Sequence, residues 1–179
     1  MLSPKTRYRH SDPAVYLVGP TGSGKSTAGK LLARNLRTEF IDTDREIEQR
    51  AGKSISQIFE LFGEKFFRDQ ETAVIEEISS RTGIVVATGG GAILRPENRS
   101  SMRNGVVVYL QTSVRQQYER VKRSTHRPLL ETDDPESTLT EMMRVRDPLY
   151  RSEADILLPT DNRSTHEIAK SIEQRLMTL

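Results

Sequence analysis

The segment 19–26 reads GPTGSGKS and matches the pattern G-x-x-x-x-G-K-[ST] of a phosphate-binding P-loop without a gap. A short apolar run at 15–18 leads into it, and a helical pattern of apolar residues that begins at Ala28 follows it. Strand, glycine turn and helix in this order are the context that the motif requires. Of all the features of the sequence, this one most constrains the fold, because it predicts a βα unit with a phosphate site at its turn.

Each part of the motif has a physical role in binding a nucleoside triphosphate. The glycines let the backbone curl so that successive N–H groups point at phosphate oxygens, and the helix adds its positive N-terminal end. Lys25 can reach the β- and γ-phosphates, and the Ser26 hydroxyl can bind Mg²⁺. The alternative is a glycine-rich turn with a chance Lys-Ser pair, which the correct flanks disfavour. The sequence therefore predicts that the chain binds ATP or GTP.

Length and composition narrow the class of protein. The 179 residues suit one domain over 1–179, and no apolar run approaches membrane-spanning length. The formal net charge of +2 is too small to argue for a nucleic-acid partner. With no cysteine, disulfides and thiolate metal sites are excluded. The polar segment 1–13 lacks the apolar stretch of a secretory signal, so we expect a loose N-terminal tail and a cytoplasmic protein.

Apolar runs alternate with helical patterns along the rest of the chain. Further short strands are expected at 39–44, 84–87, 106–110 and 156–158. Helices are expected at 45–49, 55–62, 64–80, 96–102, 114–123, 137–146 and 165–176, with a break at Gly63 and an end at Asp147-Pro148. This alternation predicts a parallel sheet covered on both faces, with ligands at the carboxyl ends of its strands.

Two acids follow the expected second strand. Asp42 and Asp44 face the same way if the chain is extended there. Paired acids beside a P-loop can hold Mg²⁺ through water or accept a hydrogen bond from a substrate hydroxyl. A helix N-cap beside a solvated aspartate is the alternative, which we would favour if the P-loop were absent. The next strand ends at Thr88 without an acid, so Asp42 is the better metal candidate.

Three consecutive glycines at 89–91, which we call the glycine segment, follow the strand at 84–87. A tight turn rarely needs three glycines, so we expect another group to approach this backbone closely. Two arginines stand out from the ordinary solvated ones. Arg68 has Glu71 one helical turn later to orient it, and Arg146 precedes Asp147-Pro148. If the fold brings both together, they can clamp a carboxylate or phosphate with forked hydrogen bonds.

A polar stretch at about 123–135 is predicted to form a mobile lid. Arg127 lies within it, where it could swing onto transferring phosphates, and Arg120 lies just before it, where it could stack on a purine ring. The histidines have no metal-ligand spacing and are interpreted as surface residues. They are His10, His126 and His166.

Five stretches in this order resemble shikimate kinases of the bacterial type. They are the P-loop at 19–26, the run DTD at 42–44, the run FRDQE at 67–71, the glycine segment, and RPLL at 127–130 with RDPLY at 146–150. The P-loop is shared by many nucleotide-binding proteins, but the other four in this order are specific. The resemblance runs from about Val15 to the last helix, which is nearly the whole chain.

The resemblance implies an α/β, three-layer P-loop kinase fold with a five-stranded parallel sheet in the order 2-3-1-4-5. Helices would cover both faces of the sheet, substrate-binding helices would span about 43–80, and the lid would be mobile. The implied reaction transfers the γ-phosphoryl group of ATP to the 3-hydroxyl of shikimate with Mg²⁺. We expect a monomer whose partner is the small molecule shikimate, with neither nucleic acid nor membrane.

The resemblance also implies roles for individual positions. Asp44 matches the residue that binds the reacting hydroxyl and is the candidate base, and Arg127 matches the lid arginine. Together with Lys25 they form the expected catalytic set. Mg²⁺ is expected on Ser26 and, through water, on Asp42. The positions matched to shikimate binding are Asp44, Arg68, Gly89, Gly90, Gly91 and Arg146. The positions matched to nucleotide binding are Gly22, Ser23, Gly24, Lys25, Ser26, Thr27, Arg120, Arg127 and Arg163.

Two alternatives stay open on the sequence. One is a kinase for another small metabolite or for a nucleoside monophosphate, which the carboxylate clamp disfavours only through the family match. The other is a nucleotide-binding regulatory module that has lost catalysis, against which the intact Lys25, Asp44 and Arg127 argue. Turnover assays with different acceptors would separate the three.

Overall fold

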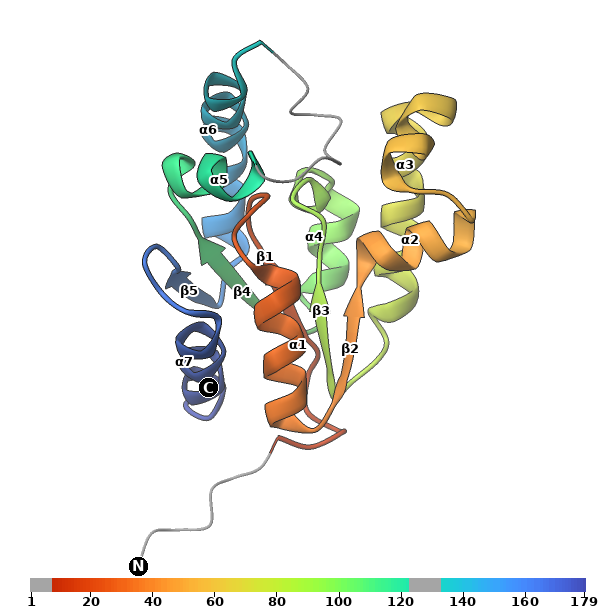
Figure 1. Cartoon of the computed structure of the whole chain (residues 1–179). Coiled ribbons are helices and arrows are strands. Elements are labelled where there is room, and N and C mark those ends of the chain that lie inside the picture. The colour runs from red at the N-terminus through yellow and green to blue at the C-terminus, as the bar shows by residue number, and fades with distance from the viewer. Residues whose placement is uncertain (1–7, 123–132) are drawn as a thin grey trace, which may run out of the picture.

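The computed structural model describes residues 8–122 and 133–179. Its strands form one parallel sheet in the order β2-β3-β1-β4-β5 (Figure 1), which confirms the predicted order. The strands are β1 Val15–Val18, β2 Glu39–Asp42, β3 Ile84–Ala87, β4 Val106–Gln111 and β5 Ile156–Pro159.

Helices cover both faces of this sheet, as predicted. Helices α1 and α7 pack on one face, while α3, α4 and α6 contribute to the core on the other (Figure 1). No helix in the described part of the chain is long and apolar enough to cross a membrane. The helices are α1 Lys25–Leu36, α2 Thr43–Ala51, α3 Ile55–Ile78, the 3₁₀ turn η1 Ala92–Leu94, α4 Pro96–Met102, α5 Val114–Val121, α6 Pro135–Glu153 and α7 Thr165–Leu176.

The central strand β1 shows why the strand sequences are continuously apolar. Successive side chains of a strand point to opposite faces, so Val15 and Leu17 pack towards α1 and α7, while Tyr16 and Val18 pack towards α3, α4 and α6. All four residues are fully buried. A strand covered on both faces needs apolar side chains at every position, and this fixes β1 in the middle of the molecule.

Helix boundaries follow local chemistry where a cap or a glycine is present. Ser54 and Ser164 each accept a hydrogen bond from the backbone at the third residue of the helix that follows, forming capping boxes at α3 and α7. Helix α3 is kinked at Gly63, whose φ of 79° and ψ of 171° are not helical. This kink confirms the predicted break, and it divides the long helix into two arms at an angle (Figure 1).

The predicted end of the helix before Asp147-Pro148 is wrong, because α6 continues through Pro148 to Glu153. Proline within a helix removes one backbone hydrogen bond and clashes with the preceding turn, which costs about 3 kcal/mol. Tertiary contacts override this cost. Tyr150 is fully buried, and Leu149 packs against the same core.

The predicted loose tail at 1–13 is corrected for residues 8–13. Gly83 donates its N–H to the carbonyl of Asp12 at 2.7 Å, and the Thr82 hydroxyl donates to the carbonyl of His10 at 2.8 Å. Tyr8 packs against the core beside α1. These contacts tie the segment to the turn before β3, while residues 1–7 lie outside the described part of the chain.

Candidate active site

The P-loop lies between β1 and α1, as the motif predicts. Gly24 precedes α1 with a φ of 90°, a left-handed conformation that a residue with a Cβ rarely adopts. At Gly19 a Cβ would lie 2.6 Å from the carbonyl oxygen of Leu110. Glycine is therefore required at both positions for the loop to curl over the N-terminus of the helix.

The Lys25 side chain folds into this curl and is nearly buried, with 8% of its surface exposed. Its Nζ donates to the carbonyls of Gly19 at 2.8 Å and Pro20 at 2.7 Å, and it lies 3.3 Å from the Ser23 hydroxyl. The ammonium is thus held inside the loop, where the backbone amides of a P-loop surround phosphate. Thr27, in the first turn of the helix, is exposed, and its hydroxyl lies 3.4 Å from the Gly24 carbonyl.

Ser26 and Asp42 meet at the N-terminal end of α1. The Ser26 hydroxyl donates to Asp42 Oδ2 at 2.6 Å, while Asp42 Oδ1 caps α2 by accepting from the backbone N–H groups of Asp44 and Arg45. Mg²⁺ in kinases is commonly held by one or two protein oxygens together with phosphates and water. No group of three or more His, Asp or Glu side chains forms a metal cage among the described residues. The pair Ser26–Asp42 fits such a shared Mg²⁺ site.

Asp44 does not extend the strand beside Asp42, so the predicted geometry is wrong in this respect. Strand β2 ends at Asp42 and α2 begins at Thr43, because Asp42 caps the helix directly. The helical turn sends the two carboxylates in different directions. Asp42 faces Ser26, whereas Asp44 Oδ1 faces the glycine segment and lies 2.9 Å from the position of a Cβ at Gly89.

The glycine segment follows β3 and lies against both arginines that the sequence singled out. A Cβ at Gly91 would lie within 2.3–2.4 Å of the guanidinium atoms of Arg68, and a Cβ at Gly90 would lie 3.7 Å from Nη1 of Arg146. Arg68 comes from α3 and Arg146 from α6, which are far apart in the sequence. The fold therefore brings the two arginines, Asp44 and the glycine segment together beside the P-loop.

Comparison with known proteins places this site in a family. The shikimate kinase family model matches residues 21–177. The chain is 48% identical to the shikimate kinase of Hahella chejuensis over 163 residues, which is 90% of this chain and 85% of that protein. It is 50% identical to that of Pseudomonas syringae pathovar syringae over 166 residues, covering 92% and 96% of the two chains. The chain belongs to the shikimate kinase family.

A solved shikimate kinase confirms the fold as well. The enzyme from Acinetobacter baumannii, determined in complex with shikimate, superposes with a TM-score of 0.92 at 44% identity and covers 94% of this chain and 95% of its own. Membership confirms the predicted enzyme class, an ATP-dependent kinase that uses Mg²⁺ and acts on a hydroxyl group.

Sequence reasoning underestimated one residue of this kinase, Glu71. It was expected only to orient Arg68, and it does so: Arg68 Nη1 donates to Glu71 Oε2 at 2.8 Å. The structure also shows that Glu71 is fully buried, with Oε1 2.5 Å from the Cβ position at Gly89. Burial raises the pKa of Glu71 to about 7, although the charge of Arg68 opposes this shift. Nothing in the local sequence signals that burial.

Two hydroxyl groups that hold the glycine segment also escaped prediction. The Thr43 hydroxyl accepts the N–H of Gly89 at 3.1 Å, and the Tyr150 hydroxyl donates to the carbonyl of Gly90 at 2.5 Å. Both residues lie inside motifs of the kinase family that the sequence displays, but neither was given a role. Their contacts join segments that are 46 and 60 residues apart, so a local pattern does not reveal them.

The arginines predicted on the nucleotide side lie in different places. Arg120 Nη1 donates to the P-loop carbonyl of Gly22 at 2.8 Å, so it borders the phosphate site of the kinase. Arg163 donates to the carbonyls of Pro159 and Glu167, each at 3.2 Å, and is bound within the connection between β5 and α7. Arg127 lies outside the described residues, as does most of the predicted lid.

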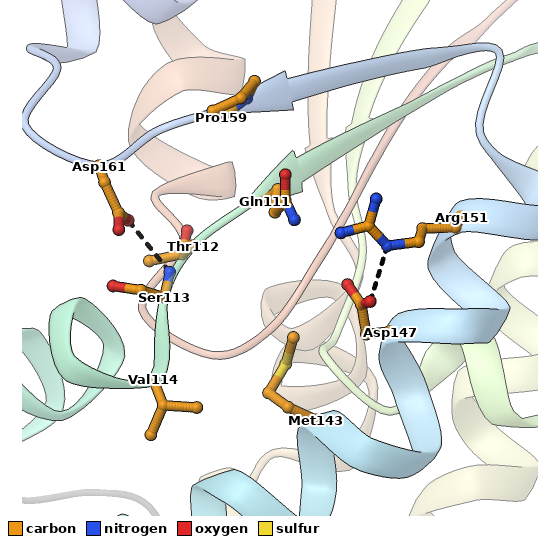
Figure 2. Close-up of a pocket in the computed structure, with 9 residues that line it drawn as sticks. All are labelled: Gln111, Thr112, Ser113, Val114, Met143, Asp147, Arg151, Pro159 and Asp161. Atoms are coloured by element: carbon orange, nitrogen blue, oxygen red, sulfur yellow. Dashed lines mark hydrogen bonds and ion pairs between the residues drawn. The ribbon is translucent and has the colours of Figure 1, made fainter.

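A separate cavity of about 460 Å³ lies at the carboxyl ends of β4 and β5, between α5 and α6 (Figure 2). Asp147 pairs with Arg151 at one side of it, and Asp161 accepts the N–H of Ser113 at another. The described residues that line this cavity include none of the predicted site residues. They are Gln111, Thr112, Ser113, Val114, Met143, Asp147, Arg151, Pro159 and Asp161.

Proposed function

We propose that the chain transfers the γ-phosphoryl group of ATP to the 3-hydroxyl of shikimate, giving shikimate 3-phosphate and ADP. Family membership supports this reaction, and the related Acinetobacter baumannii enzyme was determined with shikimate bound. The structural observation that carries the proposal is the convergence of Arg68, Arg146 and Asp44 on the glycine segment beside the P-loop. Two cations, one acid and bare backbone suit an acceptor that has one carboxylate and several hydroxyls.

On the acceptor side of the proposed site, different residues bind different groups of shikimate. Arg68 and Arg146, the clamp arginines, bind the shikimate carboxylate through charge-assisted hydrogen bonds. Gly89, Gly90 and Gly91 let the ring lie close to the backbone. Asp44 accepts a hydrogen bond from the reacting hydroxyl and takes its proton as the oxygen bonds to the γ-phosphorus and the bond to the β–γ bridging oxygen breaks.

The nucleotide side supplies positioning and charge. The P-loop amides and Lys25 bind the phosphates. Ser26, and Asp42 through water, would hold Mg²⁺, which when bound would supply positive charge to the phosphate oxygens. Phosphoryl transfer needs little covalent help from the protein, so orientation and neutralisation account for most of the catalysis. The remaining nucleotide contacts are proposed for Gly22, Ser23, Gly24, Thr27, Arg120, Arg127 and Arg163, with Arg127 also acting on the transferring phosphoryl group.

A coupled assay of ADP release tests the proposed function. ADP should appear only when shikimate, ATP and Mg²⁺ are all present, and EDTA should stop its release. Gluconate and nucleoside monophosphates serve as alternative acceptors, and their turnover without turnover of shikimate would contradict the proposal. ATP binding without turnover of any acceptor would favour a regulatory module. A monomeric state and a cytoplasmic location stay predictions.

A further inference from the structure

A buried tyrosine joins helix α6 to the glycine segment. Tyr150 is fully buried, and its hydroxyl donates to the carbonyl oxygen of Gly90 at 2.5 Å. Arg146 lies four residues earlier on the same helix, one turn away, with Nη1 3.7 Å from the Cβ position of Gly90. One helix thus presents a clamp arginine and a hydrogen-bond donor to the same short stretch of backbone.

The direction of this hydrogen bond fixes the orientation of a peptide unit. The Gly90 carbonyl and the Gly91 N–H belong to one planar, trans peptide, so they point in opposite directions. With the carbonyl turned towards Tyr150 and the core around it, the N–H points away from that core. Glycines on both sides give the peptide unusual freedom to rotate, so a partner that holds one orientation has a large effect here.

The path between Arg146 and Tyr150 contains Pro148. Proline has no N–H, so the carbonyl of Arg144 cannot receive its usual hydrogen bond within the helix. The turn that connects the arginine to the tyrosine is therefore weaker than an ordinary turn. The contact from Tyr150 to Gly90 fixes the far end of this turn and so holds the backbone of Arg146 in register with the glycine segment.

A second tyrosine provides a comparison within the same layer. The Tyr109 ring stacks on Tyr150 with the ring centroids 4.9 Å apart. Its hydroxyl donates to Asp147 Oδ1 at 2.7 Å, and Asp147 also accepts from Arg151 at 2.7 Å beside the cavity (Figure 2). Tyr109 therefore holds α6 to the sheet, and its hydroxyl bonds to Asp147 on that helix and not to the glycine segment.

We propose that Tyr150 is a positioning residue for the acceptor: its hydroxyl orients the Gly90–Gly91 peptide so that the Gly91 N–H faces the bound acceptor, and it keeps Arg146 in register. The inference rests on the proposed function, in which the glycine segment contacts bound shikimate. Burial raises the pKa of the Tyr150 hydroxyl, so it remains a donor at neutral pH.

The test compares Tyr150→Phe with the matched control Tyr109→Phe. Each variant removes one buried hydroxyl and keeps the ring that packs. Equilibrium titration with shikimate, steady-state kcat and KM for both substrates, and Tm are measured for each. Tyr150→Phe should raise the Kd and KM for shikimate roughly fivefold or more and leave the KM for ATP nearly unchanged. Tyr109→Phe should lower Tm but leave shikimate binding close to that of the wild type.

Three outcomes would overturn the inference. If Tyr150→Phe lowers Tm but binds shikimate normally, the residue is only structural. If Tyr109→Phe weakens shikimate binding equally, the effect comes from general loosening of α6. If the wild type binds and phosphorylates an acceptor other than shikimate, the proposed function fails, and the inference fails with it. Normal turnover of shikimate by the wild type separates the first two outcomes from the third.

Discussion

At the scale of single residues, the separation of Asp42 from Asp44 is decisive for the mechanism. Asp42 caps α2 and faces Ser26, whereas Asp44 faces the glycine segment. Asp44→Asn keeps the size of the side chain but removes its charge and its ability to take a proton. We expect kcat to fall by about 10²–10⁴, the range for a general base, with ATP affinity little changed.

Steady-state kinetics and a nucleotide titration check this prediction. Asp42→Asn is the matched comparison, because it alters the neighbouring acid and should weaken binding of ATP in the presence of Mg²⁺. If Asp44→Asn instead abolished ATP binding, Asp44 would belong to the metal site. The two acids would then have to exchange roles.

Glu71 gives the molecule a pH dependence that follows from its burial. Its pKa is raised from an ordinary value of 4.5 to about 7, mainly by burial. A raised carboxyl pKa means that the folded state binds the proton more tightly than the unfolded state. The protonated Glu71 carboxyl therefore stabilises the folded state in full below pH 4.5, and this stabilisation is lost as pH rises through 7. The shift corresponds to roughly 3 kcal/mol over this interval.

Urea unfolding of the wild type and Glu71→Gln across this pH interval measures the effect. Glutamine cannot ionise, so we expect the free energy of unfolding of the variant to vary less with pH, and the advantage of the wild type to shrink as pH rises. Parallel stability curves for the two proteins would show that Glu71 is already ionised in the folded protein, held so by Arg68.

At the scale of elements, side chains of α3 lie so close to the glycine segment that they leave no room for a Cβ at Gly89 or Gly91. A Cβ at Gly91 would overlap the guanidinium of Arg68, and the φ of −93° at Gly91 is open to any residue. The obstacle to Gly91→Ala is therefore the arginine itself and not the backbone conformation. We expect Gly91→Ala to displace Arg68 and to raise the KM for shikimate about tenfold or more, with the KM for ATP retained.

Gly24→Ala is the contrasting variant, because nothing lies within 4 Å of a Cβ there but φ is 90°. It strains the P-loop, so its main effect should be on ATP. A Gly91→Ala protein with normal KM for shikimate would mean that Arg68 does not hold the acceptor. Steady-state kinetics with each substrate varied in turn distinguish these results.

The same elements show what the sequence could and could not predict. Strands β1, β3, β4 and β5 were recognised because burial on both faces leaves continuous apolar runs, and the start of α3 at Ile55 was recognised because Ser54 precedes it as a cap. The continuation of α6 through Pro148 was missed because its cause is the burial of Tyr150, a tertiary contact. Local propensity reports the cost of the proline but not the packing that offsets it.

The candidate site also has features that the sequence indicates and features that only the fold reveals. Positions that lie within a short motif, such as Lys25, Ser26 and Arg68, were singled out from the sequence, and their roles stay proposals. The helical placement of Asp44, the burial of Glu71 and the anchor from Tyr150 depend on segments that meet only in the fold. A motif therefore singles out which residues to consider, but it does not reveal the partners that orient each of them.

At the scale of the whole molecule, the proposed site has two halves built from different elements. The nucleotide half comes from the P-loop, α1 and Asp42 at the end of β2, and the acceptor half comes from Asp44 in α2, from α3, from the glycine segment and from α6. Ligands that bind only the folded state stabilise it by about 2.7 kcal/mol at a hundred times their Kd. For a chain of this length each kcal/mol corresponds to roughly 2–4 °C in Tm, so each ligand should raise Tm by about 5–10 °C.

Thermal unfolding with and without each ligand tests whether the halves are separable. We expect Arg68→Ala to lose most of the shift caused by shikimate and to keep the shift caused by ADP with Mg²⁺. Lys25→Met, which keeps the apolar stem but removes the ammonium, should show the reverse. Each shift is measured from the variant's own Tm without ligand, because Arg68 also pairs with the buried Glu71 and its loss alters stability by itself.

Lys65→Ala is the control for Arg68→Ala, since Lys65 lies on the same helix with 87% of its side chain exposed. It should respond to both ligands as the wild type does. Loss of both shifts in Arg68→Ala would mean that the acceptor half supports the P-loop structurally. Retention of both Tm shifts in Arg68→Ala would mean that the shikimate carboxylate binds elsewhere. Arg146→Ala would then be expected to bind shikimate normally as well. The predicted pattern, one shift lost in each variant, requires two half-sites that meet only where the phosphoryl group is transferred.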